Sequence, residues 1–243
     1  MTQSIPLEFY TFVPQFGQRN ASPFCLKLET YLALAGVEHA RHEIMDPRQA
    51  PKEKMPYIVH GASEMGDSEL IINYLKSKFG DPLGDGLTDA QKAKSHALNV
   101  MLAERFYWAA MIYPRWIEGK HFDLLTETWF GMIPGFLRGI ITKKIFKDIA
   151  KGAKAHGIGK HSESEIYALG LSDLKALEAQ LGDKDFLLDE KPREIDASAY
   201  AFLSGTNSEI FPTPLSAYIQ SRPKLLAYID RVEMAAFGSL WTG

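Results

Sequence analysis

Cysteine is almost absent from this sequence, since Cys25 is the single thiol among 243 residues. One thiol closes no intramolecular disulfide and builds no cysteine-based zinc site. An excess of positive charge is lacking too, because 27 Lys and Arg face 30 Asp and Glu, and this balance argues against a nucleic-acid partner. No apolar run approaches the roughly 18 residues that cross a bilayer, and the first residues lack the pattern of a secretory signal. We therefore expect a cytoplasmic protein.

The composition that remains is that of an ordinary folded chain. Apolar residues make up 46% of the sequence and charged residues 23%, which argues against disorder. The seven histidines do not fall at metal-ligand spacings. The sequence thus predicts a packed protein without a metal.

The first eighty residues alternate between short strand and helix patterns. The expected strands cover residues 7–12, 39–44, 57–60 and 64–65, and the expected helices begin at Pro23 and Glu69. Gly36 and Phe79 close these two helices. This order predicts an α/β domain over residues 1–80.

After a connection rich in glycine over residues 80–86, the period changes to that of helices. Helical patterns cover residues 88–114, 133–154, 164–181, 195–204, 214–220 and 223–237. The first of them is expected to break at Pro114. The sequence therefore predicts a second, all-α domain over residues 88–243.

The sharpest local motif is Ser22-Pro23-Phe24-Cys25, where the first loop meets the first expected helix. Ser22 suits the N-cap and Pro23 the first helical position. A helix N-terminus carries partial positive charge, which favours a thiolate, and a serine hydroxyl can donate a hydrogen bond to a bound sulfur. The motif alone fits a simple helix cap equally well.

Two further segments bear on this choice. Met55-Pro56 precedes a short strand, where a cis peptide bond would turn the backbone of Met55 toward an extended ligand, although trans is the commoner state. Asp67-Ser68 begins the next helix, where first-turn amides and the Ser68 hydroxyl could hold a carboxylate and Asp67 an ammonium group. An ordinary helix cap is the alternative for this pair.

Taken in order, these motifs resemble the glutathione transferase superfamily. The runs Ala21–Glu29 and Ile195–Leu203 look like the metaxin and failed-axon-connections type of transferase homologue. The resemblance covers nearly the whole chain. It implies a thioredoxin-like N-terminal domain that binds glutathione, an all-α C-terminal domain, a second apolar substrate and a homodimer.

The resemblance also implies roles for individual residues. Ser22 would stabilise the glutathione thiolate, and Pro56 would be the cis-proline. Met55 would pair its backbone with the cysteinyl part of glutathione, while Asp67 and Ser68 would hold its γ-glutamyl end.

Two departures from the family pattern are visible. Arg193 stands three residues before Asp196, where the family usually carries a Ser or Thr N-cap. The loop over residues 13–21 is also long, which leaves Tyr10 on the first strand as an alternative thiol partner. We favour Ser22, because a strand tyrosine more often packs in the core.

Cys25 lies one helical turn beyond Ser22 and is expected to be a buried, inert thiol. If it were exposed with a low pKa, the protein could act as a glutathione-dependent reductase. Farther along, an aromatic cluster between Phe106 and Trp116 lies on the first long helix of the second domain, which borders the active-site cleft in the resembled fold; Arg105 and Tyr107 lie on the same helix. These two are weak candidates for the second substrate site, since such stretches more often form plain core.

The segment 131–160 carries seven cationic residues and one acid. Its apolar residues are expected to share one helical face, with the charge opposite. A surface helix packed on its neighbours is the commonest cause of this pattern. Peripheral contact with an anionic membrane and attraction of an anionic ligand are the alternatives.

Together these observations predict a glutathione transferase that conjugates the glutathione thiolate to a small apolar electrophile, with Ser22 as the activating group. A metaxin-like, non-catalytic binding or targeting module is the alternative from another class. A reductase acting through Cys25 ranks third.

Overall fold

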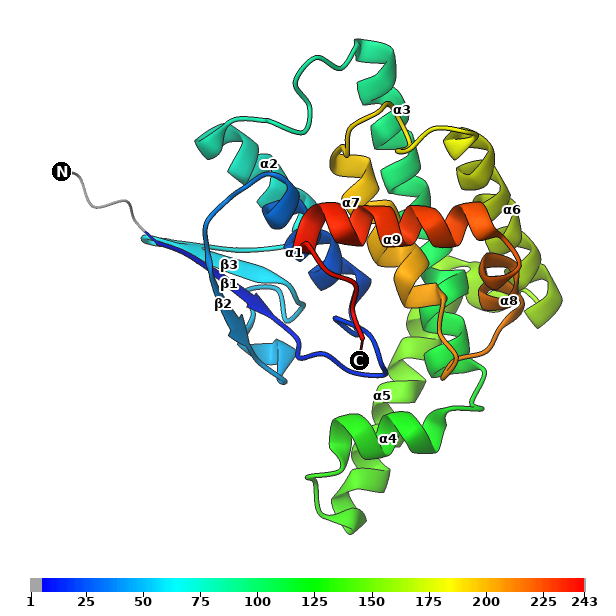
Figure 1. Ribbon diagram of the computed structural model, residues 1–243. Coiled ribbons are helices and arrows are strands. Elements are labelled where there is room, and N and C mark those ends of the chain that lie inside the picture. Colours follow the sequence, from blue (N-terminus) through cyan, green and yellow to red (C-terminus); the bar gives the residue numbers. More distant parts are fainter. Residues whose placement is uncertain (1–5, 243) are drawn as a thin grey trace. The chain divides into compact units, whose positions relative to one another are not determined.

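The computed structural model describes residues 6–242 and groups them into two compact units (Figure 1). The first unit takes in the chain up to Asn99, Gln180–Gly205 and the stretch from Pro223 onward. The second takes in Val100–Ala179 and Thr206–Arg222. The two domains predicted from the sequence, residues 1–80 and 88–243, are continuous stretches of chain, whereas each compact unit combines separate stretches. The predicted domain boundary therefore stays a prediction.

The first unit is built on a four-stranded mixed sheet. Its strands are β1 (Leu7–Thr11), β2 (Ala40–Glu43), β3 (Tyr57–His60) and β4 (Ser63–Gly66). The spatial order is β2-β1-β3-β4, with β1 parallel to β2 and the other pairs antiparallel. Each predicted strand is present, and β3 has the predicted bounds. The thioredoxin-like α/β fold expected for the N-terminal domain is confirmed.

Helices complete the first unit. They are α1 (Pro23–Leu34), the 3₁₀ turn η1 (Pro47–Gln49), α2 (Ser68–Phe79), α3 (Asp89–Val100), α7 (Glu194–Thr206) and α9 (Pro223–Phe237). The sheet and its helices share an apolar core, in which Phe9 of β1, Leu28 of α1, Ile58 of β3 and Ile71 of α2 are at most 1% exposed. Because α1 contacts α2 on one side and α9 on another, the helix that begins after Ser22 is held firmly.

The start of α7 is capped in an unusual way. The carboxylate of Asp196 accepts hydrogen bonds from the backbone N–H of Arg193 (2.7 Å) and of Leu187 (2.9 Å). The Arg193 guanidinium donates to Asp189 and to the carbonyl oxygens of Leu83 and Asp85. The N-cap hydroxyl is absent, as the sequence indicated, yet the carboxylate half of the capping box is kept.

The second unit is helical. It contains η2 (Met101–Phe106), η3 (Trp108–Ile117), α4 (Phe122–Phe130), α5 (Gly135–His156), the 3₁₀ turn η4 (Ile158–Lys160), α6 (Glu163–Leu181) and α8 (Pro214–Gln220). The expected break at Pro114 was wrong, because η2 and η3 are wound as π-helices. In this winding the N–H of Glu118 donates to the carbonyl of Tyr113, five residues earlier, at 2.9 Å.

The prediction of one apolar face on 131–160 with the charge opposite was also wrong. Thr142 and Ala153 of α5 are buried, which defines the packed side of this helix. Ile145 and Ile149 are half-buried toward that side, whereas Phe136 and Ile140 are exposed. The sequence pattern could not distinguish the apolar residues that pack from those that face solvent.

Within residues 6–242, none of the helices combines the length and the apolar character needed to cross a membrane.

Candidate functional site

Ser22 stands at the N-terminus of α1, as predicted. Its backbone is extended (φ −101°, ψ 120°), and its Oγ accepts a hydrogen bond from the N–H of Cys25 at 3.4 Å. The side chain is half-buried. A hydroxyl has one hydrogen to donate besides its acceptor sites. Ser22 can therefore cap the helix and donate to a bound thiolate from the same oxygen.

Asn20 fixes the position of Ser22. Its Oδ1 accepts from the N–H of Ser22 at 3.0 Å. Its Nδ2 donates to Thr11 Oγ1 at 2.8 Å and to the carbonyl of Phe12 at 3.0 Å, at the end of β1. Because Asn20 is 1% exposed, these bonds are protected from water and tie the helix start to the sheet.

The segment before β3 adjoins the start of α1. The Met55–Pro56 peptide bond is cis. Met55 is buried in a small cluster with Cys25, Ala50 and Tyr57. The ladder between β3 and its neighbours begins at Tyr57, so the backbone of Met55 lies just outside the sheet pairing, and its side chain packs with Cys25 in the first turn of α1.

Cys25 is buried, as expected. The side chain is fully buried, and burial raises the pKa of its thiol to about 11. The thiolate, which is the reactive form, is therefore rare at neutral pH.

Asp67 begins α2 in a conformation that non-glycine residues seldom adopt, with φ 89° and ψ 115°. Its Oδ1 accepts from the N–H groups of Glu69 (3.0 Å) and Leu70 (3.2 Å). Strained backbone of this kind collects at ligand sites. Asp67 is exposed and Ser68 is buried, so the helix start offers one solvent-facing carboxylate beside a shielded hydroxyl.

The two hydrogen bonds to Asp67 change the expectation that the first-turn amides of α2 hold a ligand carboxylate. The amides of Glu69 and Leu70 already bind the carboxylate of Asp67. Any ligand carboxylate at this helix start would thus depend on Ser68 rather than on the whole first turn.

A buried lysine joins the two helix starts. Lys27 of α1 is 1% exposed, and its Nζ donates to Glu69 Oε2 at 2.7 Å and to Asn99 Oδ1 at 2.9 Å. Asn99 Nδ2 donates to the same Glu69 oxygen at 2.6 Å, and Ser198 Oγ donates to Asn99 Oδ1 at 2.7 Å. Burial acts to raise the pKa of Glu69, but its bonds to Lys27 and Asn99 outweigh this and lower it.

Tyr10 is engaged elsewhere. Its hydroxyl donates to Glu8 Oε2 at 2.8 Å, and this bond, together with burial, raises the pKa of Tyr10 to about 12. Its ring stacks on Tyr57 with centroids 4.3 Å apart, and on His42 at 4.7 Å. These contacts favour Ser22 over Tyr10 as the thiol partner.

Arg105 and Tyr107 belong to the second unit. Arg105 forms a bidentate ion pair with the buried carboxylate of Asp173 in α6. Tyr107 packs edge-on against Trp108, with centroids 6.2 Å apart. The ion pair gives Arg105 a structural role within its own unit, and the suggested role of both residues in substrate binding stays a prediction.

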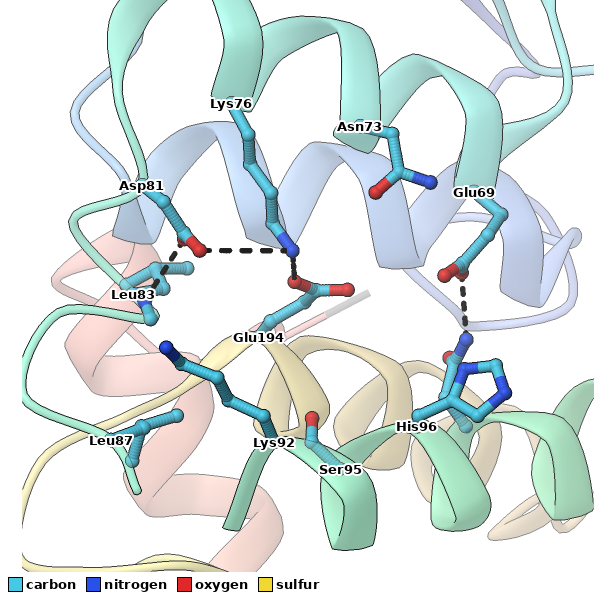
Figure 2. A pocket seen from close by; sticks show the side chains of 12 residues that line it. Glu69, Asn73, Lys76, Asp81, Leu83, Leu87, Lys92, Ser95, His96 and Glu194 are labelled. Atoms are coloured by element: carbon cyan, nitrogen blue, oxygen red, sulfur yellow. Dashed lines mark hydrogen bonds and ion pairs between the residues drawn. The ribbon is translucent and has the colours of Figure 1, made fainter. Parts of the chain in front are cut away.

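One pocket of about 330 Å³ lies in the first unit between α2 and α3. Figure 2 shows Lys76 and Glu194 pointing toward each other within it, where they form an ion pair. Glu69 and Asn99 also line this pocket, whereas the five residues predicted to bind glutathione do not. Two members of the Lys27 network therefore face this pocket.

Within residues 6–242, histidine, cysteine and carboxylate side chains form no group of three that could hold a metal.

The sequence reading missed Asn20, Lys27 and Asn99. Asn20 carried a usable signal, since an asparagine two residues before an N-cap can accept from the backbone. Lys27 carried one as well, because it stands between Leu26 and Leu28 in a helix with an apolar face. Its partners, however, lie 42 and 72 residues away in the chain.

Comparison with known sequences gives a consistent picture. Residues 23–121 match the glutathione S-transferase N-terminal domain, and residues 170–232 match the glutathione S-transferase C-terminal domain. The chain is 33% identical over 236 residues to isoprene-epoxide–glutathione S-transferase of Rhodococcus sp. (strain AD45), covering 92% of this chain and 96% of that protein.

Two other similar proteins are Failed axon connections and a metaxin. The chain is 32% identical to Failed axon connections of Drosophila melanogaster over 90% of its own length, but it spans only 55% of that protein. It is 22% identical to the Metaxin-1 homolog of Caenorhabditis briggsae, covering 76% of this chain and 60% of that protein.

Solved structures show the same fold at lower identity. The β-etherase LigF of Sphingobium sp. strain SYK-6 matches with a TM-score of 0.63 at 18% identity, over 94% of this chain and 95% of that one. A glutathione S-transferase of Methylobacterium radiotolerans in complex with glutathione sulfonate matches with a TM-score of 0.59 at 17% identity, over 94% and 90% of the two chains.

Proposed function

Because the chain belongs to the glutathione S-transferase family, we propose that it conjugates glutathione to a small apolar electrophile, with Ser22 stabilising the thiolate. The observation that carries this proposal is the placement of the Ser22 hydroxyl. The hydroxyl caps α1, and the Ser22 side chain is half-buried. The backbone N–H of Ser22 donates a hydrogen bond to the buried side chain of Asn20.

The chemistry follows from this placement. Glutathione bound along Met55, Asp67 and Ser68 would bring its sulfur to the Ser22 hydroxyl and the positive end of α1, and both stabilise a negative charge. The thiol proton leaves to solvent. The sulfur lone pair then forms a bond to the electrophilic carbon, the leaving atom takes the bonding electrons, and a proton from solvent completes the product.

The experiment is a titration of glutathione into the wild type and Ser22→Ala, with the pKa of the bound thiol followed by thiolate ultraviolet absorbance. We expect the wild type to bind glutathione with a depressed thiol pKa. In Ser22→Ala the pKa should rise by about one unit, because the donated hydrogen bond is lost.

Two further variants separate this role from helix capping. Ser22→Thr keeps both the cap and the hydroxyl, so the depressed thiol pKa should persist. Ser22→Asp keeps a capping oxygen but adds negative charge, so the thiol pKa should rise above that in Ser22→Ala. Equal thiol pKa values in the wild type and Ser22→Ala would refute the role of Ser22.

The electrophile is the second part of the proposal. The Rhodococcus relative carries an epoxide in its name, so small apolar epoxides are the first compounds to assay. Attack on an epoxide carbon opens the ring, and the resulting alkoxide takes up a proton. The proposed reaction would be supported if Ser22→Ala no longer consumed glutathione in the presence of the epoxide while Ser22→Thr still did.

A non-catalytic binding module is the rival function. Similarity to Failed axon connections and to a metaxin supports this rival. If neither the wild type nor Ser22→Thr binds glutathione in the titration, the rival becomes the better proposal.

The reductase alternative through Cys25 has little support. Its thiol is fully buried with a pKa raised to about 11, whereas a reductase needs an accessible thiolate. Cys25→Ala should leave both glutathione binding and any disulfide reductase activity unchanged. A loss of reductase activity in this variant would reinstate the alternative.

Family membership also leads us to propose a cytoplasmic homodimer. Light scattering after gel filtration checks its mass, and fractionation of the source cells checks its location.

A further inference from the structure

The turn between α4 and α5 carries an exposed apolar cluster, which we call the α4–α5 tip. It consists of Met132, Phe136, Leu137, Ile140 and Ile141. Met132, Phe136 and Ile140 are 101%, 77% and 68% exposed, the three highest values for large apolar side chains within residues 6–242. Apolar clusters of this kind on a protein surface mark sites of interaction.

The tip is held in a fixed shape. Arg138 Nε donates to the carbonyl of Ile133 at 3.1 Å, and its Nη2 donates to the carbonyl of Gly131 at 2.9 Å. Its Nη1 forms an ion pair with Glu127 of α4. One side chain thus ties the turn to both helices, which Figure 1 shows as neighbours joined by this short connection.

A row of exposed lysines follows the tip along α5, and we call it the lysine row. It consists of Lys143, Lys144, Lys147, Lys151 and Lys154. Asp148 is the single acid of α5, and it pairs with Lys144 at 2.8 Å. The row therefore keeps a clear excess of positive charge.

The tip and the lysine row lie on the same side of α5. Phe136 and Lys143 are seven residues apart, as are Leu137 and Lys144, and seven residues make almost two full turns of an α-helix. The opposite side contains the buried Thr142 and Ala153 and contacts η3. The outward side of α5 therefore begins apolar and becomes cationic about two turns later.

From this arrangement we propose that the α4–α5 tip inserts into the surface of a membrane rich in anionic lipid, with the lysine row on the headgroups. Such a surface places hydrocarbon directly beneath a layer of negative charge, which matches the order of apolar and cationic residues along α5. The proposal does not depend on the transferase activity.

The charge pattern favours a membrane over a second copy of this chain. In a symmetric dimer through this side, each subunit presents the same patch to the other. Asp148 is the single acid of α5 and already pairs with Lys144, so the second copy would not neutralise the lysine row. Anionic lipid headgroups neutralise the lysine row and leave the tip free to enter the acyl region.

Vesicle flotation tests the proposal on the full chain. The probes are vesicles of phosphatidylcholine alone and vesicles with about one-quarter phosphatidylglycerol. We expect the wild type to float with the vesicles that contain phosphatidylglycerol and not with those of pure phosphatidylcholine. Raising the salt concentration should release the protein from the anionic vesicles, because salt screens the charge of the lysine row.

Two double variants separate the two parts of the surface. Phe136→Ser/Ile140→Ser removes apolar insertion, and Lys147→Glu/Lys151→Glu reverses charge; each should lower the bound fraction at least tenfold. The controls make the same changes elsewhere on exposed residues, Phe79→Ser/Met234→Ser and Lys94→Glu/Lys175→Glu. These controls should float like the wild type.

Each remaining outcome overturns the proposal. One is a folded wild type that stays off anionic vesicles. Another is a tip or lysine variant that floats like the wild type. A third is light scattering showing that the tip variant converts a dimer to a monomer while vesicle binding is absent in both, since this would assign the surface to a second copy. Circular dichroism of every variant verifies that it is folded.

Discussion

The Oδ1 atom of Asn20 accepts the backbone N–H of Ser22 at 3.0 Å, which anchors the helix cap from a site that water does not reach. The other end of the same side chain donates to Thr11 and Phe12 at the end of β1. The position of Ser22 is therefore fixed by the sheet, through Asn20, as well as by α1.

Asn20→Ala should weaken this anchor. Buried polar groups of Ser22 and Thr11 lose a partner, which we expect to cost about 1–3 kcal/mol of unfolding free energy. Glutathione affinity should fall and the bound thiol pKa should rise, because Ser22 is less well placed. Urea denaturation and the absorbance titration measure the two effects. If only stability changes, Asn20 has no role in positioning Ser22.

Lys27→Met should affect α1 and α2 together. The variant leaves the carboxylate of Glu69 without its ammonium partner, and because that carboxylate is partly exposed, we expect a loss of about 1–3 kcal/mol, less than for a fully buried pair. The pKa of Glu69 should rise. Since a lowered folded pKa stabilises the wild type above the unfolded value near 4.3, this contribution disappears as pH falls.

Denaturation of Lys27→Met, Glu69→Leu and the double variant measures the coupling between the two side chains. If the losses of unfolding free energy in the two single variants add up to the loss in the double variant, then Lys27 and Glu69 are not coupled, and this prediction is wrong.

Asp67→Gly should separate stability from binding. Glycine accepts φ 89° without strain, a gain of about 1 kcal/mol that offsets the few tenths lost with the cap. Glutathione affinity should nevertheless drop about tenfold, since the ligand ammonium loses its carboxylate. Asp67→Asn is the matched control, because it keeps a capping oxygen and tolerates positive φ while removing the charge.

We expect both variants to bind glutathione weakly while remaining at least as stable as the wild type, as measured by calorimetry and thermal melting. Unchanged affinity in Asp67→Asn would show that Asp67 serves the helix alone.

Asp196 gives a pH dependence of known sign. Burial raises the pKa of its carboxyl to about 6, against the hydrogen bonds from Leu187, Tyr228 and Arg193. The folded protein therefore binds a proton between about pH 4 and 6 that the unfolded chain has released. This group stabilises the fold fully below pH 4, and its contribution is lost as pH rises through 6.

The loss amounts to about 3 kcal/mol at 1.4 kcal/mol per pKa unit. Asparagine does not titrate, so the unfolding free energy of Asp196→Asn should not decrease in this way between about pH 4 and 6. The variant should be less stable than the wild type at every pH, because the amide replaces one of the two carboxylate oxygens that accept hydrogen bonds. The test is the difference in unfolding free energy between wild type and variant across pH 4–7. A constant difference would contradict the raised pKa.

Local sequence signals accounted for much of the fold. The bounds of β3 and the cap at Ser22 agree with the prediction because strand residues, proline and N-cap side chains act over a few neighbouring positions. The helix α4 (Phe122–Phe130) was not predicted, since it spans little more than two turns and carries no N-cap side-chain bond.

Long-range contacts were beyond a sequence reading. Nothing near Lys27 in the chain reveals that Glu69 and Asn99 will meet its ammonium group. The side of α5 that packs is set by its neighbours, so the isoleucines of 131–160 could not be divided into buried and exposed ones. Both cases depend on tertiary structure rather than on periodicity.

The packing of α9 on α1 has a consequence for synthesis in the cell. During translation, the strands and α1 leave the ribosome long before α9 exists, so the apolar surface that α9 covers stays exposed to solvent and to chaperones. The Arg19–Glu233 ion pair, at 3.3 Å, likewise forms only once α9 has been made. The first unit therefore gains its full set of contacts only after translation has passed α9.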